Sequence, residues 1–335
     1  MDALNLATTY ILIALIVTLI WAPLLIHLLY RMNIVVKHIL IGKVNNEFIK
    51  IHGHKSGTPT MGGLMISITV AILAVVLLPN TGLRMVFLLG WILFTLYGLA
   101  DGLLAIGRKI SKKLSLFDES FLWRMLKLAV LLLIGAVSTV TIFNTLGITE
   151  LTLIGSVVLP INAITIPLFT LGMIFALLGM EITDGADGLV TGKFLIVLTA
   201  YAVISALSGH LELLPFLGLT IGSSLIYLYF NINPARVFMG GTGTLPIGFL
   251  LVLCAFVTNS VLPFAIMGLI FWVEIFSSTT QILSIKFLKR KLYRIAPIHH
   301  YFEAIGWSET KVVERFWWAG AILAVVALWV FSVYR

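Results

Sequence analysis

Long apolar stretches separated by short polar segments follow one another along almost the whole chain. A helix that crosses a lipid bilayer needs roughly 20 mostly apolar residues. Ten stretches approach that length, at residues 6–30, 62–78, 84–106, 122–142, 162–180, 189–207, 213–230, 244–259, 263–285 and 316–333. The pattern predicts an all-α, polytopic integral membrane protein with about ten transmembrane helices.

The composition supports a membrane protein. Of the 335 residues, 60% are hydrophobic and only 11% are charged, whereas a soluble protein needs more polar residues to cover its surface. Residues 1–5 lack the basic segment that opens a cleavable signal peptide, and the first apolar stretch is long enough to span. We expect one transmembrane domain over residues 1–335, without an internal repeat or a separate soluble domain.

Lys and Arg residues gather in alternate connections between the apolar stretches. Four of these, 31–61, 107–121, 231–243 and 286–315, hold 17 of the 22 basic residues. Basic loops stay cytoplasmic, so both termini are predicted to face outward. The formal net charge of +8 then belongs to one face, where contact with anionic lipid or attraction of an anionic substrate explains it without nucleic acid.

Two further features limit the fold. The only cysteine, Cys254, falls within an apolar stretch, which excludes disulfides and cysteine-based metal sites as organising elements. Residues 143–161 form the longest connection on the predicted outer side, and their Thr, Val and Ile content predicts a short hairpin there.

Acidic residues are scarce in this chain, so the positions of the fourteen are informative. Glu181, Asp184 and Asp187 recur every three residues where the sixth helix is predicted to open, a spacing that would place them on one helix face. Three carboxylates at a membrane edge suit a hard divalent cation such as Mg²⁺. The alternative is that Asp184 only caps the helix in a glycine-containing turn.

Two more acids fall inside apolar stretches. Asp101 lies near the predicted cytoplasmic end of the third helix, and Glu274 lies within the ninth. Carboxylates at these depths are costly and usually line a polar cavity or bind an ion. An ion pathway, and hence a transporter, is therefore one functional class to consider, although no inverted repeat supports it.

Polar, glycine-rich segments flank these acids on the predicted cytoplasmic face. Residues 55–63 combine Lys55 with glycines and hydroxyl side chains, which can present backbone N–H groups to a phosphate or simply allow close helix packing. Residues 231–243 form a second such segment. Residues 297–303 carry His299 and His300 beside several basic residues, where the histidines could contact a phosphate or a nucleotide or remain merely solvated.

Four strings in these segments resemble the phospho-N-acetylmuramoyl-pentapeptide transferase family and occur in the family's order. They read GTPTMGG (57–63), TDGADGL (183–189), NINPARVFMGGTG (231–243) and APIHHYFE (296–303). The resemblance covers essentially the whole chain. The related polyprenyl-phosphate N-acetylhexosamine-1-phosphate transferases share the acidic strings but differ in the first and last.

The resemblance implies a bacterial enzyme of the cytoplasmic (inner) membrane that acts in peptidoglycan biosynthesis. Its substrates would be UDP-MurNAc-pentapeptide and undecaprenyl phosphate in the lipid bilayer, its products lipid I and UMP, and its cofactor Mg²⁺. The family also implies a possible homodimer. By match, the catalytic residues would be Lys55, Asp101, Asp184 and Asp187. The substrate-binding residues would be Thr58, Gly62, Asn231, Arg236, His299, His300 and Glu303.

The chain departs from the family at charged positions. The second acid of an Asp-Asp pair is Gly102, a lysine shortly after it is Ala105, and the third histidine is Tyr301. The family's principal Mg²⁺ ligand, the aspartate of its FMGD string, is Gly241 here, and an asparagine is replaced by Glu181. Either Glu181 and Asp184 hold the metal in a rebuilt site, or the chain is a weak or inactive homologue that binds lipid phosphate or a partner.

Overall fold

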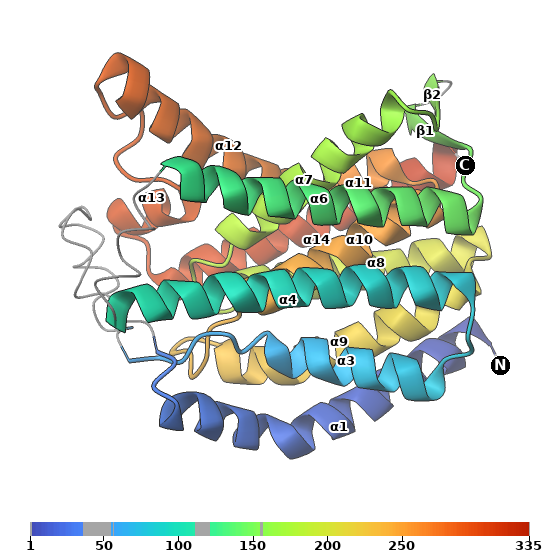
Figure 1. Cartoon of the computed structure of the whole chain (residues 1–335), viewed down its shortest axis with the longest axis horizontal. Helices are drawn as coiled ribbons and strands as arrows, with labels where there is room; N and C mark the ends of the chain where they lie inside the picture. Colours follow the sequence, from blue (N-terminus) through green and yellow to red (C-terminus); the bar gives the residue numbers. More distant parts are fainter. Residues whose placement is uncertain (1, 36–54, 56, 111–120, 155–156, 335) are drawn as a thin grey trace.

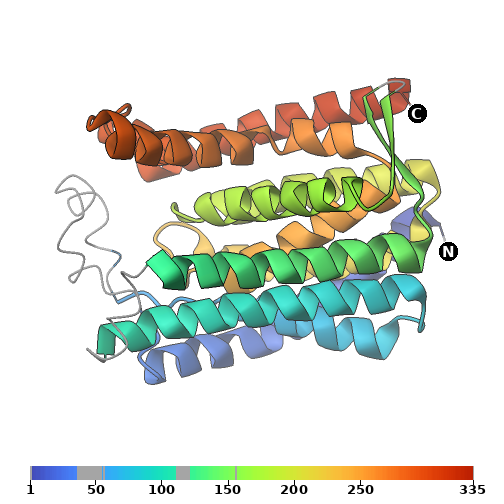
Figure 2. The same cartoon turned by 45° about the horizontal axis from the view of Figure 1, so that its top comes forward.

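Long helices lie side by side in one bundle in the computed structural model of this chain, which describes residues 2–35, 55, 57–110, 121–154 and 157–334 (Figures 1 and 2). The long apolar helices are α1 (Ala3–Arg31), α4 (Gly82–Ile110), α6 (Phe121–Leu146), α7 (Thr165–Ile182), α8 (Leu189–Ser208), α9 (Leu214–Asn231) and α14 (Glu309–Tyr334). The shorter elements among them are α3 (Leu64–Leu77), α10 (Gly241–Val257), α11 (Val261–Met267), α12 (Leu269–Leu283) and α13 (Ile298–Ala304). The all-α membrane fold is confirmed.

The structure supports the fold class more directly than it supports the predicted number of membrane crossings. Seven helices of the described residues are long and apolar enough to cross, or eight if the bent pair α11 and α12 makes one span. The predicted ten also requires the shorter helices α3 and α10 to cross. That number therefore stays a prediction.

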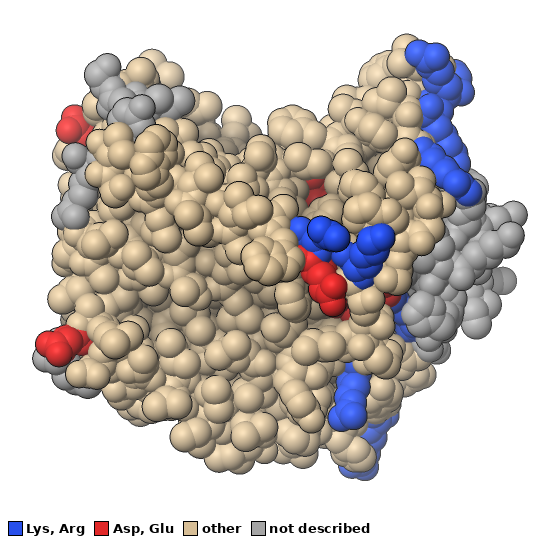
Figure 3. Space-filling view, turned by 180° about the vertical axis from the view of Figure 1, so that it is seen from behind, with Lys and Arg blue, Asp and Glu red and all other residues tan. Residues whose placement is uncertain are grey.

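Charge separates the two ends of the bundle. Lys and Arg side chains gather at one end, and the surface between the ends is almost free of charge on the face that Figure 3 shows. Both chain termini lie at the opposite end (Figure 1). We call the first of these the basic end; it carries the C-terminus of α1, the N-terminus of α14 and the far end of α12. The arrangement is the one expected if both termini face outward.

Helix α10 forms the centre of the bundle. Every side chain from Thr242 to Phe256 is buried, and α3, α4, α7, α8 and α11 all contact this helix. A helix that is apolar all round belongs in such a position, because it has no polar face to present to solvent. The outer helices differ: Ile20 of α1 and Val325 of α14 are exposed, as expected for lipid-facing side chains.

Glycines allow the backbone at the start of α10 to approach its neighbours closely. A Cβ on Gly98 of α4 would lie 2.3 Å from the carbonyl carbon of Gly241, and one on Gly63 would lie 2.3 Å from the amide nitrogen of Gly243. Small residues commonly permit such contacts between membrane helices. The start of α10 is therefore fixed between α4 and the segment before α3.

The ninth apolar stretch is not one straight helix. Helices α11 and α12 meet at Gly268 with a bend of 64°, and the indole N–H of Trp272 donates to the Ala265 carbonyl across the bend at 2.8 Å. Side chains that take over backbone groups in this way make a broken helix tolerable in a membrane. Beyond the bend, α12 continues into a short π-helical turn, Ser284–Leu288, and ends well outside the other helices (Figure 1).

Two further predictions can be compared with the structure. The hairpin predicted within residues 143–161 is confirmed as antiparallel strands β1 (Glu150–Ile154) and β2 (Val157–Pro160), with Leu151 opposite Leu159. The last helix was predicted from residue 316, but α14 begins at Glu309. Its first turns carry charged residues, so hydropathy alone does not include them.

Candidate active site

The connection between α7 and α8, residues 183–188, is the part of the basic end around which the predicted site residues gather. It is a turn and not the first turn of a helix, because α7 ends at Ile182 and α8 begins only at Leu189. Gly188 has φ +81°, a conformation that favours glycine. This corrects the prediction that Glu181, Asp184 and Asp187 share one helix face: Glu181 belongs to α7, and the two aspartates point to different partners.

Asp187 lies at the centre of a buried polar network. Its Oδ1 accepts from the Lys55 ammonium at 2.7 Å, and its Oδ2 accepts from the Asn233 side chain and the Ala235 amide, both at 3.0 Å. Glu309, at the start of α14, also accepts from Lys55 and from the Asp187 amide. Both carboxylate oxygens of Asp187 are thus used within the protein, so this residue joins four segments of the site together.

Lys55 is nearly inaccessible, at 6% exposure, and is held between two carboxylates. Burial alone would lower the pKa of its ammonium, but Glu309 and Asp187 outweigh that effect and raise the pKa above its ordinary value. Lys55 is therefore a fixed positive charge, and its position follows from contacts with segments more than 130 positions away in the sequence.

Asp184 turns toward the start of α10 instead. Its Oδ2 accepts from the Gly240 amide at 2.8 Å, and Gly240 has φ +65°. Desolvation raises the pKa of the Asp184 carboxyl to about 7, against the opposing effects of the Gly240 amide and Lys55. The alternative that Asp184 only caps α8 is not supported, since no side chain caps that helix.

Asn231, at the end of α9, contacts the same turn. Its Oδ1 accepts from the Gly188 amide at 3.0 Å and from the Thr191 hydroxyl at 3.2 Å, while its Nδ2 donates to the Val237 carbonyl at 2.9 Å. The side chain is 2% exposed. The structure thus gives Asn231 a bracing position, and its predicted contact with substrate stays a prediction.

The two histidines each pair with a carboxylate. His299 Nδ1 lies 2.9 Å from Glu274 Oε2, and His300 Nδ1 lies 2.7 Å from Glu303 Oε2. All four residues are buried, which excludes the alternative of a merely solvated histidine pair. Glu274 accordingly has a protein partner, which explains an acid within an apolar helix without an ion pathway.

Asp101 and Glu181 form the part of the site that faces α6. Asp101 Oδ1 accepts from the Lys127 ammonium at 2.5 Å, and both side chains are about 30% exposed. Lys127 therefore provides a positive charge beside Asp101 although residue 105 is an alanine. Glu181 lies within electrostatic range of Asp101 and Asp184, and its Oε1 is 3.3 Å from the point that a Cβ on Gly241 would occupy.

The other predicted substrate-binding residues, Thr58, Gly62 and Arg236, show no contact within the described part of the chain that indicates a role in substrate binding. The amides of Gly62 and Gly63 donate to the Phe238 and Met239 carbonyls, which corrects the interpretation that these amides are free for a phosphate. The segment instead packs against residues 237–243. Thr58 is half-buried and Arg236 is exposed at the basic end.

Sequence reasoning missed two members of the site. Asn233 lies inside a string singled out in the sequence, where Asn231 was chosen instead. Like Lys55, Asn233 donates to both Asp187 and Glu309. Glu309 precedes the last apolar stretch, and the signal for it was available, since it is one of only fourteen acidic residues.

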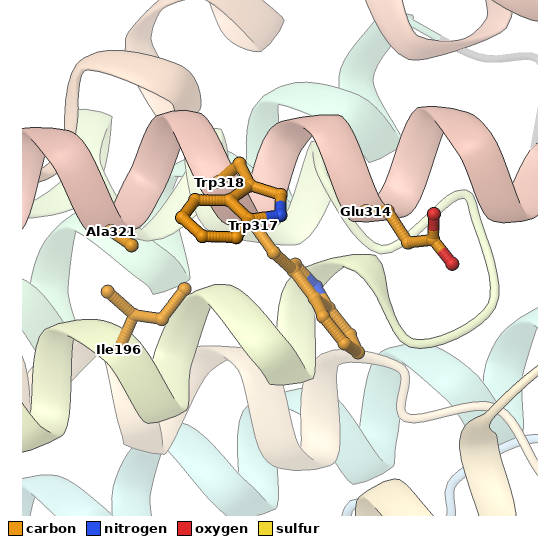
Figure 4. A pocket seen from close by; sticks show the side chains of 5 residues that line it. All are labelled: Ile196, Glu314, Trp317, Trp318 and Ala321. Carbon is orange, nitrogen blue, oxygen red and sulfur yellow. The ribbon is translucent and has the colours of Figure 1, made fainter.

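A surface pocket between α8 and α14 lies apart from this site. Its volume is about 270 Å³, and its lining consists of Ile196, Glu314, Trp317, Trp318 and Ala321 (Figure 4). None of the side chains of the network around Asp187 contributes to it. The pocket is therefore not the candidate active site.

Comparison with known proteins identifies the family of this chain. A family profile described as "Glycosyl transferase family 4" matches residues 84–259, and one described as "Phospho-N-acetylmuramoyl-pentapeptide-transferase signature 1" matches residues 55–66. The chain is 32% identical to the Phospho-N-acetylmuramoyl-pentapeptide-transferase of Staphylococcus saprophyticus over 329 residues, which cover 95% of this chain and 97% of that protein. The chain belongs to the phospho-N-acetylmuramoyl-pentapeptide transferase family.

Other members of the phospho-N-acetylmuramoyl-pentapeptide transferase family give the same result. The proteins of that name from Staphylococcus haemolyticus and Staphylococcus aureus are 33% and 32% identical, and the matches cover 95% and 96% of this chain. The chain is thus a multi-pass membrane protein of a phospho-sugar transferase family that acts in peptidoglycan biosynthesis.

Proposed function

We propose that this chain transfers phospho-N-acetylmuramoyl-pentapeptide from its UDP carrier to undecaprenyl phosphate, which yields lipid I and UMP. The proposal rests on one structural observation above all: the turn at 183–188 carries Asp184 and Asp187, and Lys55, Asn231 and His299 converge on it from distant segments. The membership of the family supplies the substrate class.

The reaction is a phosphoryl transfer, in which catalysis is mainly positioning of the phosphates and stabilisation of charge. Lys55 offers a fixed ammonium beside the turn. Lys127 and Asp101 form a second, half-exposed ion pair at the edge of the site. In the proposed reaction these charges orient the two phosphate groups, while Asp187, Glu309 and Asn231 keep the surrounding backbone in place.

A magnesium ion fits the acids of this site if the substrate supplies part of its coordination. No three His, Cys, Asp or Glu side chains within the described ranges are grouped so that they could hold a metal by themselves. Mg²⁺ is usually bound by one or two carboxylates together with phosphate oxygens and water. Glu181 and Asp184 are the candidate protein ligands, and a bound ion would neutralise charge on the pyrophosphate.

Of the described residues, Glu181 is the acid closest to the position where the family has its metal-binding aspartate, residue 241 here. Its carboxylate oxygen lies beside the space that a side chain at position 241 would enter. A carboxylate from α7 therefore reaches the start of α10, where Gly241 supplies none. We propose that Glu181 takes the metal-binding role of the acid that the family has there.

The test is UMP release by the purified chain with UDP-MurNAc-pentapeptide, undecaprenyl phosphate and Mg²⁺. We expect turnover that needs the divalent cation and falls at least 100-fold, to about the background level, in Glu181→Gln and in Asp184→Asn, since Mg²⁺ loses a main carboxylate in each. Thermal unfolding of both variants checks that the fold persists.

Two results would count against the proposal. Full activity of Glu181→Gln would exclude Glu181 as a metal ligand. Absence of UMP from folded wild-type protein that still binds the nucleotide substrate would exclude the reaction and favour a binding homologue; Gly241→Asp combined with Glu181→Asn should then create activity, because that pair moves the acid back to α10.

A further inference from the structure

Two histidine–carboxylate pairs lie against the turn at 183–188. Glu274 holds Nδ1 of His299 and Glu303 holds Nδ1 of His300, and the two ring centroids are 4.0 Å apart. Since an ionised carboxylate only accepts hydrogen bonds, Nδ1 of each ring carries the hydrogen. Nε2 of His299 is therefore the nitrogen of that ring that remains for another contact.

Both Nε2 atoms face one point of the backbone. A Cβ on Gly185 would lie 2.3 Å from Nε2 of His299 and 3.1 Å from Nε2 of His300. Gly185 separates the two aspartates of the turn, so the ring of His299 lies directly against the backbone between them. The position of the His299 ring and the position of the turn are thus mutually dependent.

His299 Nε2 is fully buried and has no hydrogen-bond partner among the described residues, and the same holds for Glu274 Oε1. A buried polar atom without a partner costs about 1–3 kcal/mol, and such atoms are rare in folded proteins. A ring nitrogen left in this state beside the aspartate turn points to a ligand that contacts it during function.

Glu274 reaches this place from inside a membrane helix. It is 0% exposed and belongs to α12, which packs against α13. An acid in such surroundings is expensive to bury and generally has a functional partner. Its hydrogen-bond partner is Nδ1 of His299, 25 positions later in the sequence.

We propose that Glu274 is a positioning residue that acts through His299. By accepting from Nδ1, it fixes the tautomer and the orientation of the ring, so that Nε2 faces Gly185 and the turn keeps its aspartates in place. The inference deepens the proposed function and rests on it for the identity of the substrate. It gives this membrane acid a part in the transfer site that does not require movement of any ion.

A double-mutant cycle on the full chain in lipid nanodiscs tests the inference. Glu274→Leu removes the acceptor, and we expect kcat to fall about 10- to 100-fold, as is typical when the partner of a functional histidine is lost. Glu274→Gln keeps an acceptor oxygen in the same place and should recover most of the loss. Once Glu274 is Leu, His299→Gln should cause little further loss, because both changes remove the same contribution.

Two readouts separate positioning from a structural role. Thermal unfolding should show similar melting temperatures for Glu274→Gln and wild type. The ¹⁵N NMR signals of His299, assigned from their absence in His299→Gln, should report an Nδ1–H tautomer in wild type and Glu274→Gln and a mixture in Glu274→Leu. This measurement needs no turnover, so it distinguishes failure of this inference from failure of the proposed reaction.

The inference would be overturned by either of two results. Additive losses for Glu274→Leu and His299→Gln would mean that Glu274 acts independently of the ring. An unchanged His299 tautomer in Glu274→Leu would mean that the carboxylate does not set it. Glu303→Gln serves as the matched comparison, since it changes the neighbouring pair and should leave the His299 signals nearly unaltered.

Discussion

At the scale of single residues, Lys55 has the most tightly determined environment in the site. Its ammonium lies between Asp187 and Glu309, both nearly buried. Removal of one member of a buried ion pair leaves an uncompensated charge and costs about 3–5 kcal/mol. We expect that loss for Lys55→Met in thermal or denaturant unfolding, against about 0.2–1 kcal/mol for Lys127→Met, whose pair with Asp101 is half-exposed.

The pH dependence of this contribution follows from the raised pKa of Lys55. A cationic group whose pKa is higher in the folded state stabilises the protein at every pH below its ordinary value of 10.5, and the contribution disappears only as the pH rises through the raised pKa. The difference between wild type and Lys55→Met should therefore be constant from pH 7 to about 9. A difference that already shrinks across this interval would contradict the pairing.

Residue types in the site could be predicted from the sequence, but the contacts between them could not. The scarcity of acids was enough to select Asp184, Asp187 and Glu274. No local pattern shows that Glu274 meets His299 or that Glu309 meets Lys55, because each pair joins separate elements through the folding of the whole bundle. The three hydrogen bonds of the Asn231 side chain are likewise visible only in the structure.

At the scale of elements, α8 contains a lysine that the site does not use. Lys193 is fully buried where α8, α12 and α14 meet, its ammonium has no hydrogen-bond partner among the described residues, and it lies 5.7 Å from the Phe271 ring centre. A Cβ on Gly320 of α14 would come within 2.1 Å of the ammonium. The pocket that Figure 4 shows lies on the outer side of the same helix contact.

Burial of a polar group without a partner costs about 1–3 kcal/mol in proteins. We therefore expect Lys193→Met, which keeps the length of the side chain, to raise the unfolding free energy by about that amount and to leave UMP release unchanged. Lys286→Met changes an exposed lysine of the same bundle and is the matched control, with no expected change. A lower unfolding free energy for Lys193→Met than for wild type would show that the Lys193 amine makes a stabilising interaction when the protein is in the membrane.

The helices themselves were predictable, and their irregularities were less so. Apolar length located most long helices to within a few residues, because burial in lipid requires an uninterrupted run of apolar side chains; the exception is the start of α14, whose first turns are charged. The bend at Gly268 was not predicted, since both halves are equally apolar. The turn at 183–188 was wrongly predicted as the start of a helix, because the three-residue spacing of the acids is typical of one helix face. The glycines that follow the two aspartates, Gly185 and Gly188, were the signal for a turn.

At the scale of the whole molecule, the separation of charge gives an orientation that can be measured. Cys254 is fully buried, so the labelling of an introduced cysteine can be measured without first removing the native one. We expect Asp2→Cys to react with a membrane-impermeant maleimide in intact cells, and Lys291→Cys to react only after the membrane is opened. Wild type, with Cys254 alone, gives the background, and the reverse labelling pattern would contradict the predicted orientation.

The proximity of Glu181 to Gly241 also has a consequence for how such a site changes during evolution. A chain with acids at both positions would crowd two carboxylates into one small space, and a chain with neither would lack the charge. The effect of a substitution at one position thus depends on the residue at the other. If Glu181 takes the metal-binding role proposed above, a lineage that moves the acid from one helix to the other would pass through one of these two unfavourable arrangements, and each single-acid arrangement would tend to persist once it is reached.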